Sequence, residues 1–204
     1  ESFFTLVYHK PRFPRIDGKM LLEYVSANPT GPLHIGHGRW AVIGSVMADL
    51  LRYIGADLST EFYINDAGSQ VQKLYASVNA VKKGESVPED GYHGHYIRDL
   101  AQANADPVVA ILAGQQAVLD TLGVRFDKWF SEKSLYGDGL VDRAIVALRK
   151  KELAYDLDGA VWFKSTAFGD EKDRVLVKST GEYTYFAVDV AYHLTKIERG
   201  FDDL

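Results

Sequence analysis

The sequence predicts an α/β fold built around a parallel sheet. A short apolar run at residues 21–25 is followed by a loop rich in Pro and Gly and then by a segment with helical apolar periodicity, which is the order strand, loop, helix. A second strand and a second helix are predicted at residues 58–64 and 71–81. Strands that alternate with helices are typical of parallel sheets with right-handed crossovers. We therefore expect residues 1–81 to form the first part of such a sheet.

The first crossover is expected to contain a helix directly after the loop. Pro29, Gly31 and Pro32 break the strand and prevent an early helix. Gly36 and Gly38 then leave the backbone bare at the opening turn. The apolar residues that follow fall on one helical stripe, namely Ile43, Val46, Met47, Leu50 and Ile54. A glycine directly after this stripe is expected to end the helix.

Two histidines, His34 and His37, stand at the predicted start of this helix. Bare backbone and two imidazoles at a helix N-terminus form a suitable site for anionic oxygens such as those of a phosphate. Two histidines three residues apart also occur as a structural pair or as zinc ligands. The chain has no cysteine and offers no third ligand at close spacing, so the sequence favours phosphate and predicts no protein-bound metal.

The regular alternation of predicted strands and helices ends at residue 82. Residues 82–91 are polar and rich in turn formers, so an insertion is expected to start there. Helices are predicted at residues 97–104 and 107–122, the second opened by a proline, and a short one at residues 141–151. A mostly helical insertion is therefore expected over residues 82–152.

Residues 153–204 are predicted to return to the first domain and to be rich in β structure. Strand-like runs stand at residues 160–164, 175–178 and 183–187, separated by turn formers. A helix is predicted at residues 190–199, with a glycine after it.

Composition excludes several classes of protein. The chain has 204 residues, of which 47% are hydrophobic and 25% charged, as expected for a globular protein with a core. Its net charge of −5 argues against general nucleic-acid binding, which depends on Lys and Arg. No apolar run approaches the roughly 18 residues of a membrane-spanning helix, so no membrane partner is expected. The lack of cysteine and of a signal-peptide pattern favours a cytoplasmic location.

Residues 23–38 carry a more specific pattern. They read Glu-Tyr-Val-Ser-Ala-Asn-Pro-Thr-Gly-Pro-Leu-His and then Ile-Gly-His-Gly. This stretch resembles the His-Ile-Gly-His signature of class I aminoacyl-tRNA synthetases, in the version found in arginyl-tRNA synthetases. Similar family blocks stand at residues 63–68, 92–96, 126–132 and 173–177. The resemblance implies a Rossmann-like parallel sheet of the class I synthetase type, first half only, with a helical insertion.

The same resemblance implies an enzyme, an arginine–tRNA ligase. Such an enzyme activates L-arginine with ATP and attaches it to the acceptor end of tRNA(Arg) through arginyl-adenylate. By resemblance, His34 and His37 are the catalytic residues. Gly36 and Gly38 join them in binding ATP, which brings its Mg²⁺.

Four residues are candidates for binding the amino acid. A guanidinium group needs planar, paired acceptors, which the carboxylates of Glu23 and Asp189 can supply. On the residues alone, Glu23 could instead lie on the surface at a strand edge and Asp189 could be a helix N-cap. The resemblance implies that Glu23 and Asn28 contact arginine and that Tyr185 and Asp189 contact its guanidinium.

The sequence departs from the family in what it lacks. Synthetases of this class complete the ATP site with a later Lys-Met-Ser-Lys-Ser-type loop, and arginyl enzymes add an amino-terminal and an anticodon-binding domain. We therefore expect a catalytic-domain fragment that is incomplete for catalysis and that self-associates through surfaces left open. Two alternatives remain open: a nucleotidyltransferase or synthetase for another amino acid, and a non-catalytic fragment that binds nucleotide or RNA.

Overall fold

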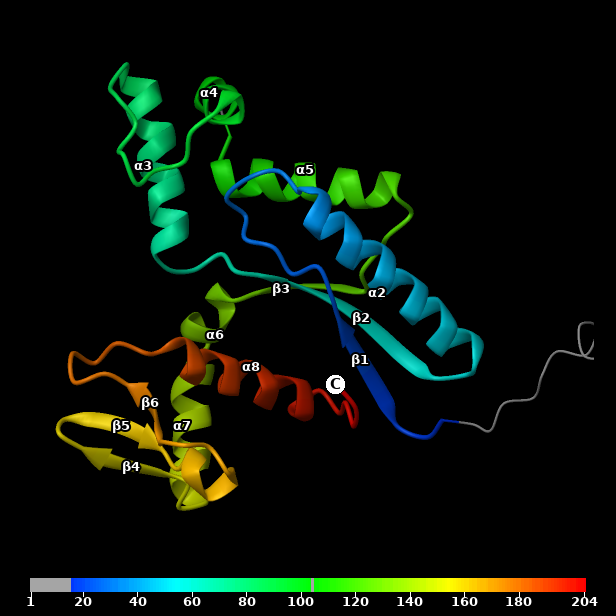
Figure 1. The fold of residues 1–204 in the computed structure, drawn as a ribbon, viewed down its shortest axis with the longest axis vertical. Coiled ribbons are helices and arrows are strands. Elements are labelled where there is room, and N and C mark those ends of the chain that lie inside the picture. The colour runs from blue at the N-terminus through cyan, green and yellow to red at the C-terminus, as the bar shows by residue number, and fades with distance from the viewer. Residues whose placement is uncertain (1–15, 104) are drawn as a thin grey trace, which may run out of the picture. The chain divides into compact units, whose positions relative to one another are not determined.

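The computed structural model describes residues 16–103 and 105–204, and Figure 1 labels its helices and strands. These residues form two units. The first runs up to Phe130 and also includes Phe201–Leu204, while the second is Ser131–Gly200.

The first unit contains the predicted parallel sheet. Strands β1 (Lys19–Glu23) and β2 (Asp57–Ile64) pair in parallel and are connected by helix α2 (Ile35–Tyr53). Strand β3 (Lys128–Ser131) follows in the order β1-β2-β3. The parallel pair and its helical crossover confirm the predicted α/β fold class.

Strand β1 is paired along both of its edges. On one edge, Glu23 lies opposite Glu61 of β2. On the other, Leu21 N donates a hydrogen bond to Asp203 O at 2.9 Å, and Asp203 N donates to Lys19 O at 3.2 Å. This bridge is also parallel, so β1 lies inside the sheet at that point.

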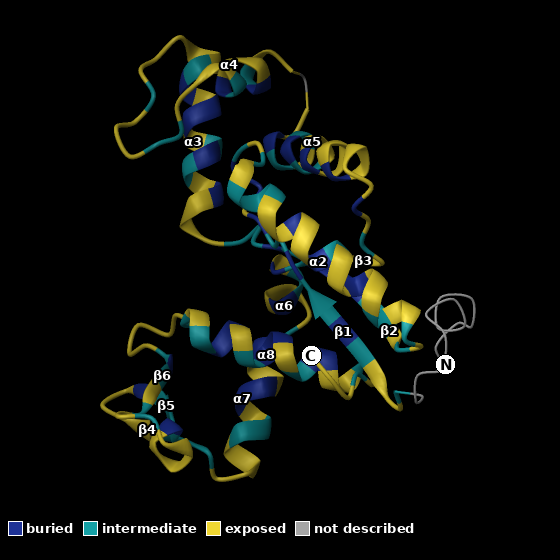
Figure 2. Ribbon diagram, turned by 45° about the vertical axis from the view of Figure 1, so that its right-hand side comes forward, coloured by how far each residue is buried: buried dark blue, intermediate teal, exposed yellow. Residues whose placement is uncertain are grey.

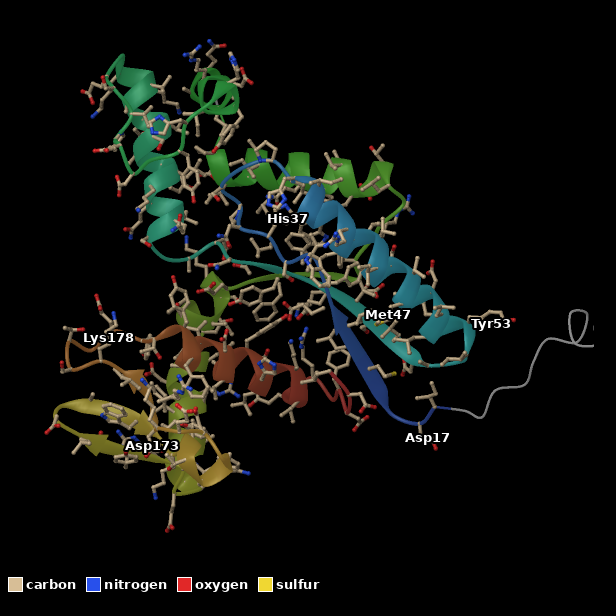
Figure 3. All side chains as sticks on the ribbon, viewed as in Figure 1. Asp17, His37, Met47, Tyr53, Asp173 and Lys178 are labelled. Carbon is tan, nitrogen blue, oxygen red and sulfur yellow. The ribbon has the colours of Figure 1, made fainter. Side chains whose placement is uncertain are left out.

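Helix α2 contacts the sheet through small residues. Its buried residues are Ala41, Gly44 and Ala48. A Cβ added to Gly44 would lie 2.2 Å from the ring of Tyr24, so only glycine allows this close approach. The predicted apolar stripe is not the buried face, because Ile43, Val46, Met47 and Leu50 are exposed. Figure 2 shows the exposed outer side of α2, and Figure 3 labels Met47 and Tyr53 along this helix.

The other helices of the first unit pack on one another. They are α3 (Ser69–Lys83), α4 (His95–Gln102) and α5 (Pro107–Thr121). Their shared core consists of Leu74, Val78, Ile97, Leu100 and Ile111. Asp106 caps α5 by accepting hydrogen bonds from the two amides that follow the opening proline, Val108 N and Val109 N. All three helices were predicted, whereas the domain boundaries at residues 82 and 152 stay predictions.

The second unit combines helices with a small antiparallel sheet. Strands β4 (Ala154–Leu157), β5 (Ala160–Phe163) and β6 (Arg174–Val177) pair in the order β4-β5-β6. Its helices are α6 (Lys133–Gly137), α7 (Leu140–Lys150), α8 (Tyr185–Glu198) and a 3₁₀ turn at Ser165–Phe168.

The prediction of a strand at residues 183–187 was wrong. Helix α8 begins at Tyr185, five residues before the predicted start of the helix at residue 190. Thr184 is its N-cap and accepts a hydrogen bond from Ala187 N through its hydroxyl. Because buried residues then recur at helical spacing, at Ala187, Val188, Ala191 and Tyr192, burial and capping outweigh the local β propensity.

Candidate active site

The loop between β1 and α2 is strained where it leaves the strand. Val25 and Ser26 have φ angles of 69° and 45°, in a left-handed region that a β-branched residue such as valine rarely adopts. Ser26 Oγ donates a hydrogen bond to Glu23 Oε1 at 3.0 Å and accepts one from Tyr63 N at 3.1 Å. The Glu23 carboxylate is thereby held at the carboxyl end of β1, the edge of a parallel sheet where ligands bind.

Two side chains from the helices hold the middle of this loop. Gln115 Nε2 of α5 donates hydrogen bonds to the carbonyl oxygens of Asn28, at 3.0 Å, and Gly31, at 2.9 Å. Tyr96 OH of α4 donates to Thr30 O at 3.0 Å. The backbone of the loop is therefore fixed, while Asn28 itself is exposed and its side chain can reach a ligand.

His34 and His37 form a reciprocal cap at the start of α2, where Figure 3 labels His37. His34 Nδ1 accepts a hydrogen bond from Gly36 N at 3.1 Å, and His37 Nδ1 accepts one from His34 N, also at 3.1 Å. The two ring centroids are 3.8 Å apart. This arrangement is a capping box in which both partners are imidazoles.

The cap determines which nitrogen of each ring carries the proton. Because both Nδ1 atoms accept from backbone amides, the neutral rings hold their proton on Nε2. Burial, and then the nearby His34, lower the pKa of His37 below its ordinary value of 6.5. His37 is therefore neutral at pH 7, and its Nε2–H donor lies beside the Nε2–H donor of His34. Two such donors at a helix N-terminus suit phosphate oxygens.

The two glycines of the motif have different surroundings. A Cβ on Gly36 would lie 2.9 Å from Cε1 of His34, so a side chain there would displace the imidazole. A Cβ on Gly38 would meet nothing within 4 Å. Both glycines border a hollow of about 660 Å³ along the first turns of α2, so the backbone is bare where a ligand can approach. The glycine that allows α2 to approach Tyr24 closely is Gly44, not either glycine of the motif.

Tyr185 and Asp189 lie in the second unit, one turn apart on α8. Both residues are exposed. The alternative that Asp189 caps a helix was wrong, because α8 already starts four residues earlier. The backbone oxygen of Asp189 lies 2.9 Å from His193 Nδ1. That these two residues contact the guanidinium of arginine stays a prediction.

Sequence reasoning missed three residues of this region. Ser26 stands in the motif loop, and its spacing of three from Glu23 was the available signal. Gln115 is a single polar residue on the apolar face of α5, which was also visible. No local pattern indicated that Tyr96 would contact the loop, because 66 positions separate it from Thr30.

Residues 16–103 and 105–204 contain neither a cluster of metal ligands nor a membrane-spanning helix. No group of three or more His, Asp or Glu side chains in this part of the chain is placed to hold a metal ion. None of the described helices is long and apolar enough to cross a membrane.

Comparison with known proteins gives consistent results. Residues 13–101 match the family model of the class I tRNA synthetase catalytic domain of the arginine type, tRNA synthetases class I (R). An arginine–tRNA ligase of Solidesulfovibrio magneticus is 50% identical over 90% of this chain, and one of Paenarthrobacter aurescens is 45% identical over 89%. The chain spans 38% and 37% of the lengths of these relatives.

Solved structures agree in fold. A Campylobacter jejuni protein described as a candidate arginyl-tRNA synthetase has a TM-score of 0.83 and 35% identity, covering 93% of this chain and 47% of its own. The Thermus thermophilus arginyl-tRNA synthetase has a TM-score of 0.74 and 25% identity, covering 95% and 38%. The chain is therefore similar to arginyl-tRNA synthetases of class I over a part of their length that includes the signature region of the catalytic domain.

Proposed function

We propose that this chain forms part of an arginine–tRNA ligase, which activates L-arginine with ATP and attaches it to tRNA(Arg). The observation that carries the proposal is the imidazole capping box of α2, which leaves two Nε2–H donors at a helix N-terminus. The names of the curated relatives support arginine as the amino acid.

The first step joins arginine to the α-phosphate of ATP. A carboxylate oxygen of arginine forms a bond to the α-phosphorus, the bond from that phosphorus to the bridging oxygen breaks, and pyrophosphate leaves. Such a site works mainly by positioning the reactants and stabilising negative charge on the phosphate oxygens. His34 and His37 donate to these oxygens, and the helix N-terminus adds partial positive charge. The Mg²⁺ bound with ATP supplies further positive charge.

The glycines keep this end of α2 accessible to the nucleotide. Gly36 leaves the His34 ring in the position that its cap requires, because a Cβ would push against it. Gly38 borders the hollow beside the helix, where the nucleotide can lie directly against the backbone. A side chain at either position would therefore weaken ATP binding, for two different reasons.

Four residues are the proposed contacts of arginine. Glu23, held by Ser26, and Asn28 bind it from the β1–α2 loop. On α8, Asp189 accepts N–H donors of the guanidinium and Tyr185 lies one turn away. In the second step, the 2′-hydroxyl of the terminal ribose of tRNA(Arg) attacks the carbonyl carbon of arginyl-adenylate, and AMP leaves. Since tRNA charging serves translation, a cytoplasmic location is part of the proposal.

Binding of ATP tests the imidazole pair directly. Isothermal titration of this chain with Mg-ATP should give an affinity that His34→Ala and His37→Ala each weaken by about tenfold, the value of one charge-assisted hydrogen bond. His93→Ala, which removes an exposed histidine outside α2, is the matched control and should bind as the parent does. Circular dichroism separates lost binding from a helix that no longer forms. Equal affinities in all four proteins would contradict the proposal.

Aminoacylation tests the reaction and the amino acid. The full-length protein should form arginyl-tRNA and not lysyl- or leucyl-tRNA, and Asp189→Asn should raise KM for arginine more than it lowers kcat. Charging with a different amino acid would support the alternative synthetase. ATP binding without any charging by the full-length protein would support a non-catalytic module.

A further inference from the structure

A second pocket of the first unit lies away from the imidazole pair. It encloses about 410 Å³ between α4, α5 and the end of the β1–α2 loop. Most of its wall is apolar, contributed by Pro32, Leu33, Tyr96, Leu100, Ile111 and Val118. This volume lies in the range of small-molecule sites, which are typically apolar with few polar groups.

One polar side chain in the wall has an unused acceptor. Gln115 lines the pocket and is only 2% exposed. Its Nε2 is fully engaged with the carbonyl oxygens of Asn28 and Gly31, which also fixes the orientation of the amide. Its Oε1 is buried and accepts no hydrogen bond from any described residue. A buried carbonyl oxygen without a donor is unfavourable, so an N–H group supplied by a ligand would be stabilised here.

The charge of the wall restricts that ligand further. Asp99 is exposed and lines the same pocket. Within residues 16–103 and 105–204, no Lys or Arg forms a salt bridge with it. No cationic side chain lines the pocket, so a phosphate or carboxylate ligand would meet only repulsion from Asp99. A protonated amine on an apolar body matches both the carboxylate and the walls.

We propose that the pocket between α4 and α5 is a binding site for a small apolar molecule that carries a protonated amine. The apolar body fills the wall formed by Leu100, Ile111 and Val118. The ammonium group lies between Asp99 and Gln115 Oε1 and donates to both. Because Oε1 is buried, the Gln115 amide has to turn to make this contact, which weakens the hydrogen bonds of Nε2 to the carbonyl oxygens of Asn28 and Gly31.

This site is linked to the β1–α2 loop by the same side chains. Gln115 and Tyr96 line the pocket and together donate three hydrogen bonds to the carbonyl oxygens of Asn28, Thr30 and Gly31. A ligand that moves either side chain therefore moves the loop that leads to His34. Occupancy of this pocket should change the affinity of the chain for ATP or arginine. This consequence rests on the proposed function, whereas the binding of the amine is independent of it.

Tryptamine is a suitable probe, because it joins an indole ring to a primary ammonium group. Titration of ¹⁵N-labelled chain, without ATP or arginine, should shift the amide signals of residues that line the pocket. The neutral 3-methylindole should bind about tenfold more weakly, and the anionic indole-3-acetate more weakly still, since the charge-assisted hydrogen bond is lost. Asp99→Asn should narrow the difference between tryptamine and 3-methylindole.

A pair of substitutions on α5 locates the site. Gly114→Leu fills the pocket without backbone strain, because a Cβ at Gly114 meets nothing within 4 Å, and it should abolish tryptamine binding. Ala113→Leu adds the same side chain to an exposed position outside the pocket and should leave binding unchanged. Equal binding by the two variants, or no binding by the parent chain, overturns the proposal. Binding without any shift of the Thr30 and Gly31 amides overturns the link to the loop.

Discussion

Helices α2 and α3 belong to the same unit, yet they use their apolar residues in opposite ways. Helix α3 buries Leu74 and Val78, as an amphipathic helix normally does. Helix α2 buries small residues and exposes large ones, with Leu50 59% and Val46 52% exposed. Figure 2 colours the buried and exposed residues along the two helices. An apolar stripe in the sequence therefore identifies the apolar face of a helix. It does not tell whether that face is buried against the neighbouring sheet.

The largest expected effect is at the buried side of α3. Leu74→Ala should lower the free energy of unfolding by about 2–5 kcal/mol, because the side chain is fully buried among Val78, Ile97 and Ile111 and its loss leaves a cavity. Chemical denaturation followed by circular dichroism measures this change. The matched variant Leu50→Ala on α2 should cost no more than about 0.5 kcal/mol, as expected for a surface position. Equal losses would remove the contrast between the helices.

The next effect is at the inner face of α2. Gly44→Ala should lower the free energy of unfolding by about 1–3 kcal/mol, although alanine favours helices, because its Cβ would overlap the Tyr24 ring. Gly114→Ala in α5 is the control, and it should stabilise the chain slightly since nothing lies within 4 Å of its added Cβ. A stabilising Gly44→Ala would show that α2 does not approach the sheet so closely. Comparing the denaturation midpoints of both variants with that of the parent chain measures these changes in stability.

A smaller effect on stability, but a clear one on association, is expected at the outer face of α2. The double variant Val46→Glu/Leu50→Glu should unfold at nearly the same denaturant concentration as the parent, because both side chains are exposed. It should also sediment as a smaller species if the predicted self-association uses this apolar face. Analytical ultracentrifugation over a range of concentrations tests this. The same sedimentation behaviour in both proteins would assign self-association to another surface.

The smallest expected effect concerns how the two helices begin. Helix α3 has no side-chain cap, whereas α2 is capped by the side chains of His34 and His37. Because the pKa of His37 is lowered in the folded state, the unfolded chain takes up the proton more readily. Stability should therefore be complete above pH 6.5 and decline as the pH falls from 6.5 towards the lowered pKa. His37→Gln should reduce this decline, as measured by thermal unfolding at several pH values. An unchanged pH dependence would show that other groups cause it.

Local patterns predicted much of the fold. Glycines and prolines placed the start of α2, and Gly55, with a φ of 94°, follows its end as expected. The helices α3, α4 and α5 and the strands β5 and β6 were also found from periodicity and propensity. The error at residues 183–187 arose because aromatic and β-branched residues favour strands locally, while Thr184 and the buried face of α8 decide the outcome.

The sequence supplied candidate residues for the site but not their geometry. The spacing of His34 and His37 indicated donors for a phosphate, but only the structure gives the capping box that leaves Nε2 as the donor atom. The contact of Gln115 with Asn28 joins positions 87 residues apart, which no local pattern reveals. Long-range hydrogen bonds of this kind depend on the packed fold and not on neighbouring residues.

The contacts of Gln115 and Tyr96 also limit how the chain can be re-engineered. The stretch from residue 82 reads as an insertion, and a designer seeking a minimal nucleotide-binding scaffold would delete α4 and α5 first. That deletion would leave the carbonyl oxygens of Asn28, Thr30 and Gly31 without their side-chain donors, and the segment ahead of the imidazole cap would lose its support. The two helices are thus structural parts of the motif itself, and a shortened version has to supply substitute donors at those three oxygens.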